Sequence, residues 1–121
     1  MRWRSTAAIV ALGAACAGAP PVPPQRFTDA EAEIKAAQEI GAENVPQGKL
    51  HLQQARDELA AAKKLSKDKP QVAARKLDVA QSEAELAKAL TREQAARAEA
   101  DDAKARLHSA QKNLSGTGGG Q

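Results

Sequence analysis

Residues 70–114 read PQVAARKLDVAQSEAELAKALTREQAARAEADDAKARLHSAQKNL, a stretch without glycine and without any proline after Pro70. Two rows of residues seven positions apart, offset by three, give the heptad spacing of a helix that packs on another helix. The first row is Val72, Val79, Leu86, Glu93, Ala100, Leu107 and Leu114, and the second is Arg75, Ser82, Ala89, Ala96, Ala103 and Ala110. This mainly apolar seam, interrupted by Glu93 and Arg75, predicts one long helix.

Two shorter helices are expected before it. The TDAE sequence at residues 28–31 reads as a capping box and Gly41 as a C-terminal stop, so the first helix is expected at about 29–41. Pro46 suits the first turn of a second helix. The apolar stripe of that helix consists of Leu52, Ala55, Leu59 and Ala62. The DKP sequence at 68–70 ends it and starts the long helix.

The lengths of these helices predict the architecture. At 1.5 Å per residue the second helix spans roughly 30 Å and the third roughly 65 Å, so the first two can cover only about half of the third. The expected fold is all-α, a short antiparallel three-helix bundle at residues 28–114 with a long, protruding, coiled-coil-like C-terminal helix. We expect the covered layer to be Val72, Val79 and Leu86.

The far half of the long helix then has nothing left to pack on within one chain. Its seam is a candidate for homo-oligomerisation or partner docking and consists of Ala96, Ala100, Ala103, Leu107, Ala110 and Leu114. The alternative is an exposed alanine-rich helix without a partner, because single exposed leucines are common on protein surfaces. Residues 115–121 are expected to form a flexible, glycine-rich tail.

The composition excludes several classes of protein. Alanine accounts for 29 of the 121 residues, tyrosine is absent, and there is one tryptophan and one phenylalanine. Alanine buries little area, so a thick core, a β-sandwich and a buried enzyme pocket are poorly supported. Without Arg2 and Arg4, which precede an apolar run, 16 basic residues face 15 acidic ones. That balance argues against a nucleic-acid partner, which requires an excess of positive charge.

The N-terminus, MRWRSTAAIVALGAACAGAPPVPP, has a basic start and a charge-free run at 6–15 that is too short to span a membrane. It resembles a bacterial lipoprotein signal peptide, in which small residues precede a cysteine that is acylated after cleavage. Here residues 1–15 would be the signal peptide and Cys16 the lipidation site, with Gly13 standing where a large aliphatic residue is usual. The alternatives for Cys16 are a bystander beside an ordinary cleavage site, or a thiol that stays free or forms a disulfide with another chain, since this sequence has no second cysteine.

Lipid anchoring also explains the next segment. The proline-rich run at 19–24 predicts an extended, semi-rigid tether within residues 16–27. By resemblance to lipoprotein sorting in bacteria with two membranes, Ala17, rather than Asp, after the cysteine points to the outer membrane, with the helical domain facing the periplasm.

A cluster of basic residues surrounds the expected turn between the second and third helices. Its members are Lys63, Lys64, Lys67, Lys69, Arg75 and Lys76. Such a patch can meet anionic lipid headgroups or an acidic glycan. The alternative is a solvated hairpin tip with cations at a helix C-terminus, where the helix dipole favours them.

No pattern predicts catalysis, a metal or a cofactor. His51 and His108 stand far apart and lack further ligands at zinc-site spacing. The glycines at 118–120 precede no helix, so they do not form a phosphate-binding loop. The carboxylates lie among lysines and arginines, as on a solvated helix surface. We therefore expect a protein that is not an enzyme and needs no cofactor.

From residue 34 to about residue 98 the chain resembles the domain-of-unknown-function-4398 family of small bacterial envelope lipoproteins. Three features carry the resemblance. The first is the segment from Ala37 through Gly41 and Ala42, followed by Pro46. The second is the set Leu52, Ala55, Leu59 and Ala62, and the third is the set Ala80, Ala84, Leu86, Ala87, Ala89 and Leu90. The resemblance implies a helical periplasmic domain, in some members joined to an OmpA-like peptidoglycan-binding domain, and supplies no catalytic residues.

The expected function is that of a non-catalytic, lipid-anchored outer-membrane protein whose helices act as a scaffold or bind an envelope partner. One alternative is a coiled-coil spacer between outer membrane and peptidoglycan, similar to the alanine-rich murein lipoprotein. The terminal lysine of that protein has no counterpart in residues 118–121, so the link would be non-covalent. A second alternative is an adaptor for an OmpA-like protein.

Overall fold

The computed structural model describes residues 20–117. Along this part of the chain the order is α1 (Pro24–Glu39), the short 3-10 helix η1 (Ala42–Asn44), α2 (Pro46–Leu65) and α3 (Pro70–Thr117). The three α-helices pack together and the described residues contain no strand, which confirms the expected all-α class. None of the described helices is long and apolar enough to cross a bilayer.

Proline and glycine set the helix ends. Pro46 and Pro70 are the first residues of α2 and α3, as expected, because the ring fixes φ at a helical value and no amide hydrogen is needed there. Gly41 has φ +85°, a left-handed conformation that follows the end of α1 and turns the chain into η1.

The expected start of α1 at residue 29 is wrong. The helix begins at Pro24, and the hydroxyl of Thr28 donates to the carbonyl oxygen of Pro24 within the helix instead of capping it. Val22 and Phe27 pack against the core, which draws this segment onto the bundle, so the expected tether ends before Pro24. At the other terminus α3 continues to Thr117, past the expected end at residue 114, and residues 118–121 lie outside the described part.

The core is built mainly from alanine. Its residues are Ala30, Ile34, Ala37, Ala42, Leu52, Ala55, Leu59, Ala62, Ala73, Leu77, Ala80, Ala84 and Ala87. Leu52 and Leu77 are the largest fully buried side chains in this set. Because most of the facing side chains are single methyl groups, the helix axes can approach closely and the core stays thin.

The face of α3 that α1 and α2 cover is not the expected one. The buried residues are Ala73, Leu77, Ala80, Ala84, Ala87 and Thr91, alternating in steps of four and three. The expected layer is wrong, since Val72 is only half-buried, and Val79 and Leu86 are 43% and 42% exposed. Helix α3 carries two stripes of the same period, and the one richer in alanine allows α1 and α2 to pack more closely.

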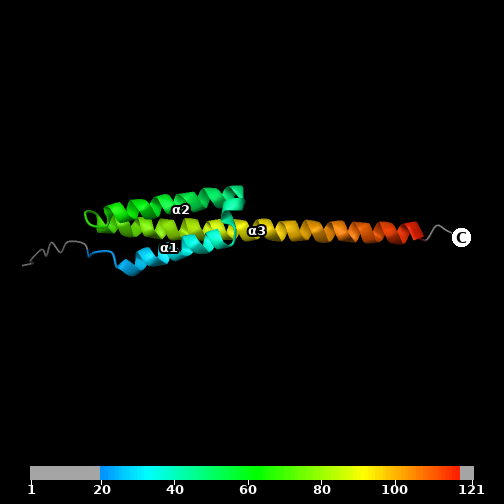
Figure 1. Ribbon diagram of the computed structural model, residues 1–121, viewed down its shortest axis with the longest axis horizontal. Coiled ribbons are helices and arrows are strands. Elements are labelled where there is room, and N and C mark those ends of the chain that lie inside the picture. Colours follow the sequence, from blue (N-terminus) through cyan, green and yellow to red (C-terminus); the bar gives the residue numbers. More distant parts are fainter. Residues whose placement is uncertain (1–19, 118–121) are drawn as a thin grey trace, which may run out of the picture.

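Side-chain contacts between the helices show the directions in which they run. Arg26 pairs with Asp78 and Glu33 with Lys88, so residue numbers rise together along α1 and α3. Between α2 and α3 the order reverses, because Lys76 lies 2.7 Å from Glu58 and Glu83 lies 2.6 Å from His51. Figure 1 shows α2 running back along α3, and α3 continuing beyond both shorter helices.

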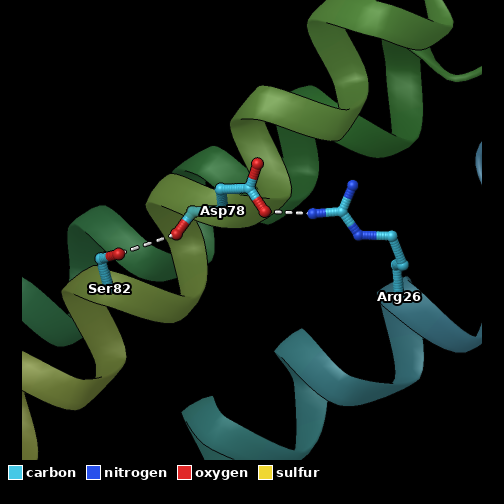
Figure 2. A network of polar contacts seen from close by, with 3 residues as sticks. All are labelled: Arg26, Asp78 and Ser82. Atoms are coloured by element: carbon cyan, nitrogen blue, oxygen red, sulfur yellow. Dashed lines mark hydrogen bonds and ion pairs between the residues drawn. The ribbon is translucent and has the colours of Figure 1, made fainter.

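The contact between Arg26 and Asp78 joins the start of α1 to the early turns of α3. Figure 2 shows the guanidinium reaching across to the carboxylate of Asp78. The backbone carbonyl oxygen of Asp78 accepts a hydrogen bond from the hydroxyl of Ser82 at 3.0 Å, one turn further along α3.

The other end of the bundle closes around a glycine. A Cβ placed on Gly48 would lie 2.9 Å from the carbonyl oxygen of Ala42 and 2.9 Å from the hydroxyl of Thr91. That hydroxyl donates to the carbonyl oxygen of Ala87 at 2.7 Å, which satisfies it in its buried position. After Thr91 every residue of α3 through 116 is exposed.

The choice of buried stripe can be tested with a matched pair of leucine variants on α3. Leu77→Ala should lower the free energy of unfolding by about 2–5 kcal/mol, because it removes a fully buried side chain. Leu86→Ala should cost less than about 1 kcal/mol, because Leu86 is partly solvated. Urea unfolding followed by circular dichroism at low protein concentration measures both, and equal losses would contradict the assigned stripe.

Gly48 provides a second test. In an open helix Gly→Ala stabilises by roughly 0.5–1 kcal/mol, but Gly48→Ala should destabilise by about 1–3 kcal/mol because the methyl group meets a backbone oxygen. Gly116→Ala is the control, since its Cβ would have nothing within 4 Å. Thermal unfolding of both variants compares them, and a rise in melting temperature for Gly48→Ala would contradict the close packing.

Candidate interaction surfaces

The basic residues around the turn between α2 and α3 form the first candidate surface, which we call the basic end. Lys63 Nζ lies 2.6 Å from Glu31 and Lys76 Nζ lies 2.7 Å from Glu58, so these two charges are balanced within the bundle. The other four predicted residues are exposed and form no ion pair within residues 20–117. They are Lys64, Lys67, Lys69 and Arg75. The basic end is therefore smaller than expected, with Asp68 as the acidic residue of its turn.

The start of α1 lies at this same end. The pairs of Arg26 with Asp78 and of Lys63 with Glu31 bring the first turns of α1 beside the end of α2 and the beginning of α3. In Figure 1 the blue start of α1 and the green turn between α2 and α3 share one end of the bundle. The N-terminal part of the chain therefore joins the domain close to the four unpaired cations.

The turn between α1 and α2 at the opposite end is fixed by polar contacts. Arg56 donates to Glu43 at 2.6 Å and Gln38 donates to the same carboxylate at 3.4 Å. These bonds, chiefly that from Arg56, hold the pKa of Glu43 below its usual value. A lowered carboxyl pKa stabilises the fold at pH values above the normal carboxyl range, and this contribution is lost as the pH falls through the lowered pKa.

The far half of α3 is the second candidate surface. All six predicted seam residues, Ala96, Ala100, Ala103, Leu107, Ala110 and Leu114, are exposed. Leu107 and Leu114 are 64% and 77% exposed, and no other described element covers them. Arg97 pairs with Glu93 and Arg106 with Asp102, each four residues apart within the helix.

The two histidines lie in different surroundings, far from each other along the bundle and α3. His51 Nδ1 lies 2.6 Å from Glu83 and links α2 to α3, whereas His108 is exposed on the far half of α3. Within residues 20–117 no three histidine, cysteine or acidic side chains lie close enough to hold a metal ion. A shallow hollow of about 380 Å³ lies where α2 begins, lined in part by Val45, Leu90 and Arg97. Cys16 lies outside the described residues.

Sequence reasoning missed two members of the exposed apolar stripe. Val79 and Leu86 were assigned to the core, yet they lie on the same exposed heptad row as Leu107 and Leu114. The row itself was visible in the sequence, because residues seven apart share one helix face. The sequence did not show that the exposed part of this row begins at Val79, within the bundle, and not only at the far half of α3.

Comparison with protein-family models, curated proteins and solved structures finds no match. The resemblance to the domain-of-unknown-function-4398 family therefore stays a prediction.

Proposed function

We propose that the chain is a non-catalytic, lipid-anchored protein on the periplasmic side of the outer membrane, which serves as a scaffold or partner-binding module. Its shape in this role is an antiparallel three-helix bundle with a protruding C-terminal half of α3. The observation that carries the proposal is the position of the basic end, which lies where the N-terminal segment joins the bundle.

This position suits attachment to a membrane. A lipid on Cys16 would be separated from Pro24 by a segment that reaches at most about 25–30 Å when extended, so the start of α1 would stay near the bilayer. The basic end would then meet the headgroups, where each well-placed cation contributes about 1 kcal/mol on an anionic surface. A diacylglyceryl group has two acyl chains and anchors a protein stably by itself, so the basic end would orient the bundle on the membrane rather than hold it there.

The other half of the proposal concerns the partner. Helix α3 has 48 residues and so extends about 72 Å, far beyond the part that α1 and α2 cover. Leu107 and Leu114 are exposed on this uncovered part, far along α3 from the basic end, and are available to another protein. A coiled-coil spacer reaching toward peptidoglycan, or an adaptor for an OmpA-like protein, is a second candidate favoured by this length. The family resemblance supports a periplasmic helical domain in either case.

Acylation can be measured directly. Mass spectrometry of the N-terminal peptide of the mature protein should show Cys16 as the first residue, carrying a diacylglyceryl group. Cys16→Ser should abolish the modification and leave either an unprocessed precursor or a soluble form. An unmodified mature N-terminus at Gly18, or retention of Met1, would contradict the lipoprotein assignment.

The role of the basic end can be tested with residues 17–121 and vesicles containing anionic phospholipid. Replacing Lys64, Lys67 and Lys69 with Gln should weaken binding by about tenfold to a hundredfold, because three unpaired cations are lost at one end. The control replaces Lys49, Lys104 and Lys112 with Gln, removing equal charge elsewhere. Co-sedimentation at low and physiological salt measures both variants, and equal losses would contradict an oriented membrane contact.

A further inference from the structure

Helix α3 presents two apolar stripes on roughly opposite faces. The buried stripe contains Leu77, Ala84 and Thr91, and α1 and α2 cover it. With about 100° of rotation per residue, Leu86 lies roughly 200° from Ala84 around the helix. The exposed stripe runs along this opposite face from the bundle to the far end and consists of Val79, Ser82, Leu86, Ala89, Glu93, Ala96, Ala100, Ala103, Leu107, Ala110 and Leu114.

A row of charges flanks the exposed stripe on one side. It consists of Glu85, Arg92, Glu99 and Arg106, which stand seven residues apart and alternate in sign. Glu85, Arg92 and Glu99 are exposed and make no ion pair within residues 20–117, whereas Arg106 pairs with Asp102 one turn away. When two copies of this row run in opposite directions, each acidic residue of one copy can face a basic residue of the other.

We propose that the exposed stripe binds a second copy of this chain, with the two α3 helices antiparallel and Ala89 of one copy opposite Ala100 of the other. In this register Arg92 faces Glu99 and Glu85 faces Arg106, and two-fold symmetry repeats each pair. Positions beside the seam on the same flank meet in this way when two helices pack antiparallel. The inference concerns α3 alone and does not depend on acylation of Cys16.

The same register also fits the side-chain sizes. Between Val79 and Ala110 the large apolar residues of the stripe meet small ones, because Leu86 faces Ala103, Val79 faces Ala110 and Leu107 faces Ser82. Leu114 lies beyond this paired part, opposite Arg75. Ala89 and Ala100 form a layer of two methyl groups, which allows the helices to approach closely. Large side chains packed against small ones across the seam give knobs-into-holes contact without overpacking.

A parallel pair would be less favourable. In a parallel heptad arrangement each flanking charge faces a residue five positions further along the other copy. Arg92 would then face Arg97, which is a repulsive contact, and Glu85 would face Leu90, with which it can form no ion pair. Only the contact between Glu99 and Lys104 would be attractive. The charges therefore select the antiparallel orientation.

The bundle leaves room for this partner. Helices α1 and α2 cover the stripe of α3 that contains Leu77 and Ala84, so the bundle of the second copy would lie along the far half of the first. The far half of each α3 would gain the cover that it lacks within one chain. The two basic ends would lie at opposite extremities, and both could meet one membrane only with the paired helices lying along its surface.

Disulfide trapping tests the register in the full chain carrying Cys16→Ser. An equimolar mixture of the Ala89→Cys and Ala100→Cys variants should form a mixed disulfide under mild oxidation, because facing Cα atoms come within about 4–7 Å. Neither variant alone should cross-link, since each cysteine would lie about 16 Å along the helix from its own copy in the partner. Self-linkage of either variant, or no linkage in the mixture, would overturn the proposal.

Charge exchange tests the pairing independently. In the same full chain Arg92→Glu or Glu99→Arg alone should weaken self-association about tenfold, since each creates two repulsive contacts across the dimer. The double variant should restore association to within about threefold of the parent, because the pairs re-form with exchanged signs. Lys112→Glu, which changes charge as much as Arg92→Glu but lies on the opposite face, should have little effect.

Sedimentation equilibrium gives the mass and the dissociation constant, and circular dichroism confirms that each variant keeps its helix content. A parent chain that sediments as a monomer at every concentration, or as a species larger than a dimer, would overturn the proposal. A double variant as weak as either single one would also overturn it.

Discussion

Close approach of alanine-lined helices is the interaction on which the rest of this structure depends. Nine of the thirteen buried apolar residues are alanine, and Leu52 and Leu77 are the largest fully buried side chains among the described residues. Methyl groups bury little area, so each contact contributes little, and stability requires many contacts along a considerable length of helix. The bundle is therefore long and thin. It ends along α3 where α1 ends and α2 begins.

The unequal helix lengths make the two ends of the bundle different. At one end the start of α1 and the cationic turn come together, held by the contacts of Arg26 with Asp78 and Lys63 with Glu31. At the other end Gly48, Ala42 and Thr91 close the core, and α3 continues without cover. A membrane contact and a protein contact can thus be separated along one helix. This separation is the physical basis of the proposed scaffold function.

Ion pairs on the bundle surface guide the arrangement more than they stabilise it. Several join residues more than thirty positions apart, such as Glu33 with Lys88 and Glu31 with Lys63, but most are partly exposed and individually weak. They fix which turn of one helix lies beside which turn of the next. Glu85, Arg92 and Glu99 on α3 lack such partners among the described residues. Their alternating charges are therefore available for ion pairs with another chain.

The sequence by itself determined the all-α class, the thin core and most of the helix ends, because Pro46, Pro70 and Gly41 act through local backbone geometry. It also located the basic turn. Only the tertiary structure decided that Lys63 and Lys76 are paired, that α1 starts at Pro24, and that Leu77 rather than Leu86 is buried. Two stripes of equal period share α3, and periodicity within one helix cannot choose between them. The choice depends on how closely α1 and α2 can approach each stripe, which is a property of three helices together.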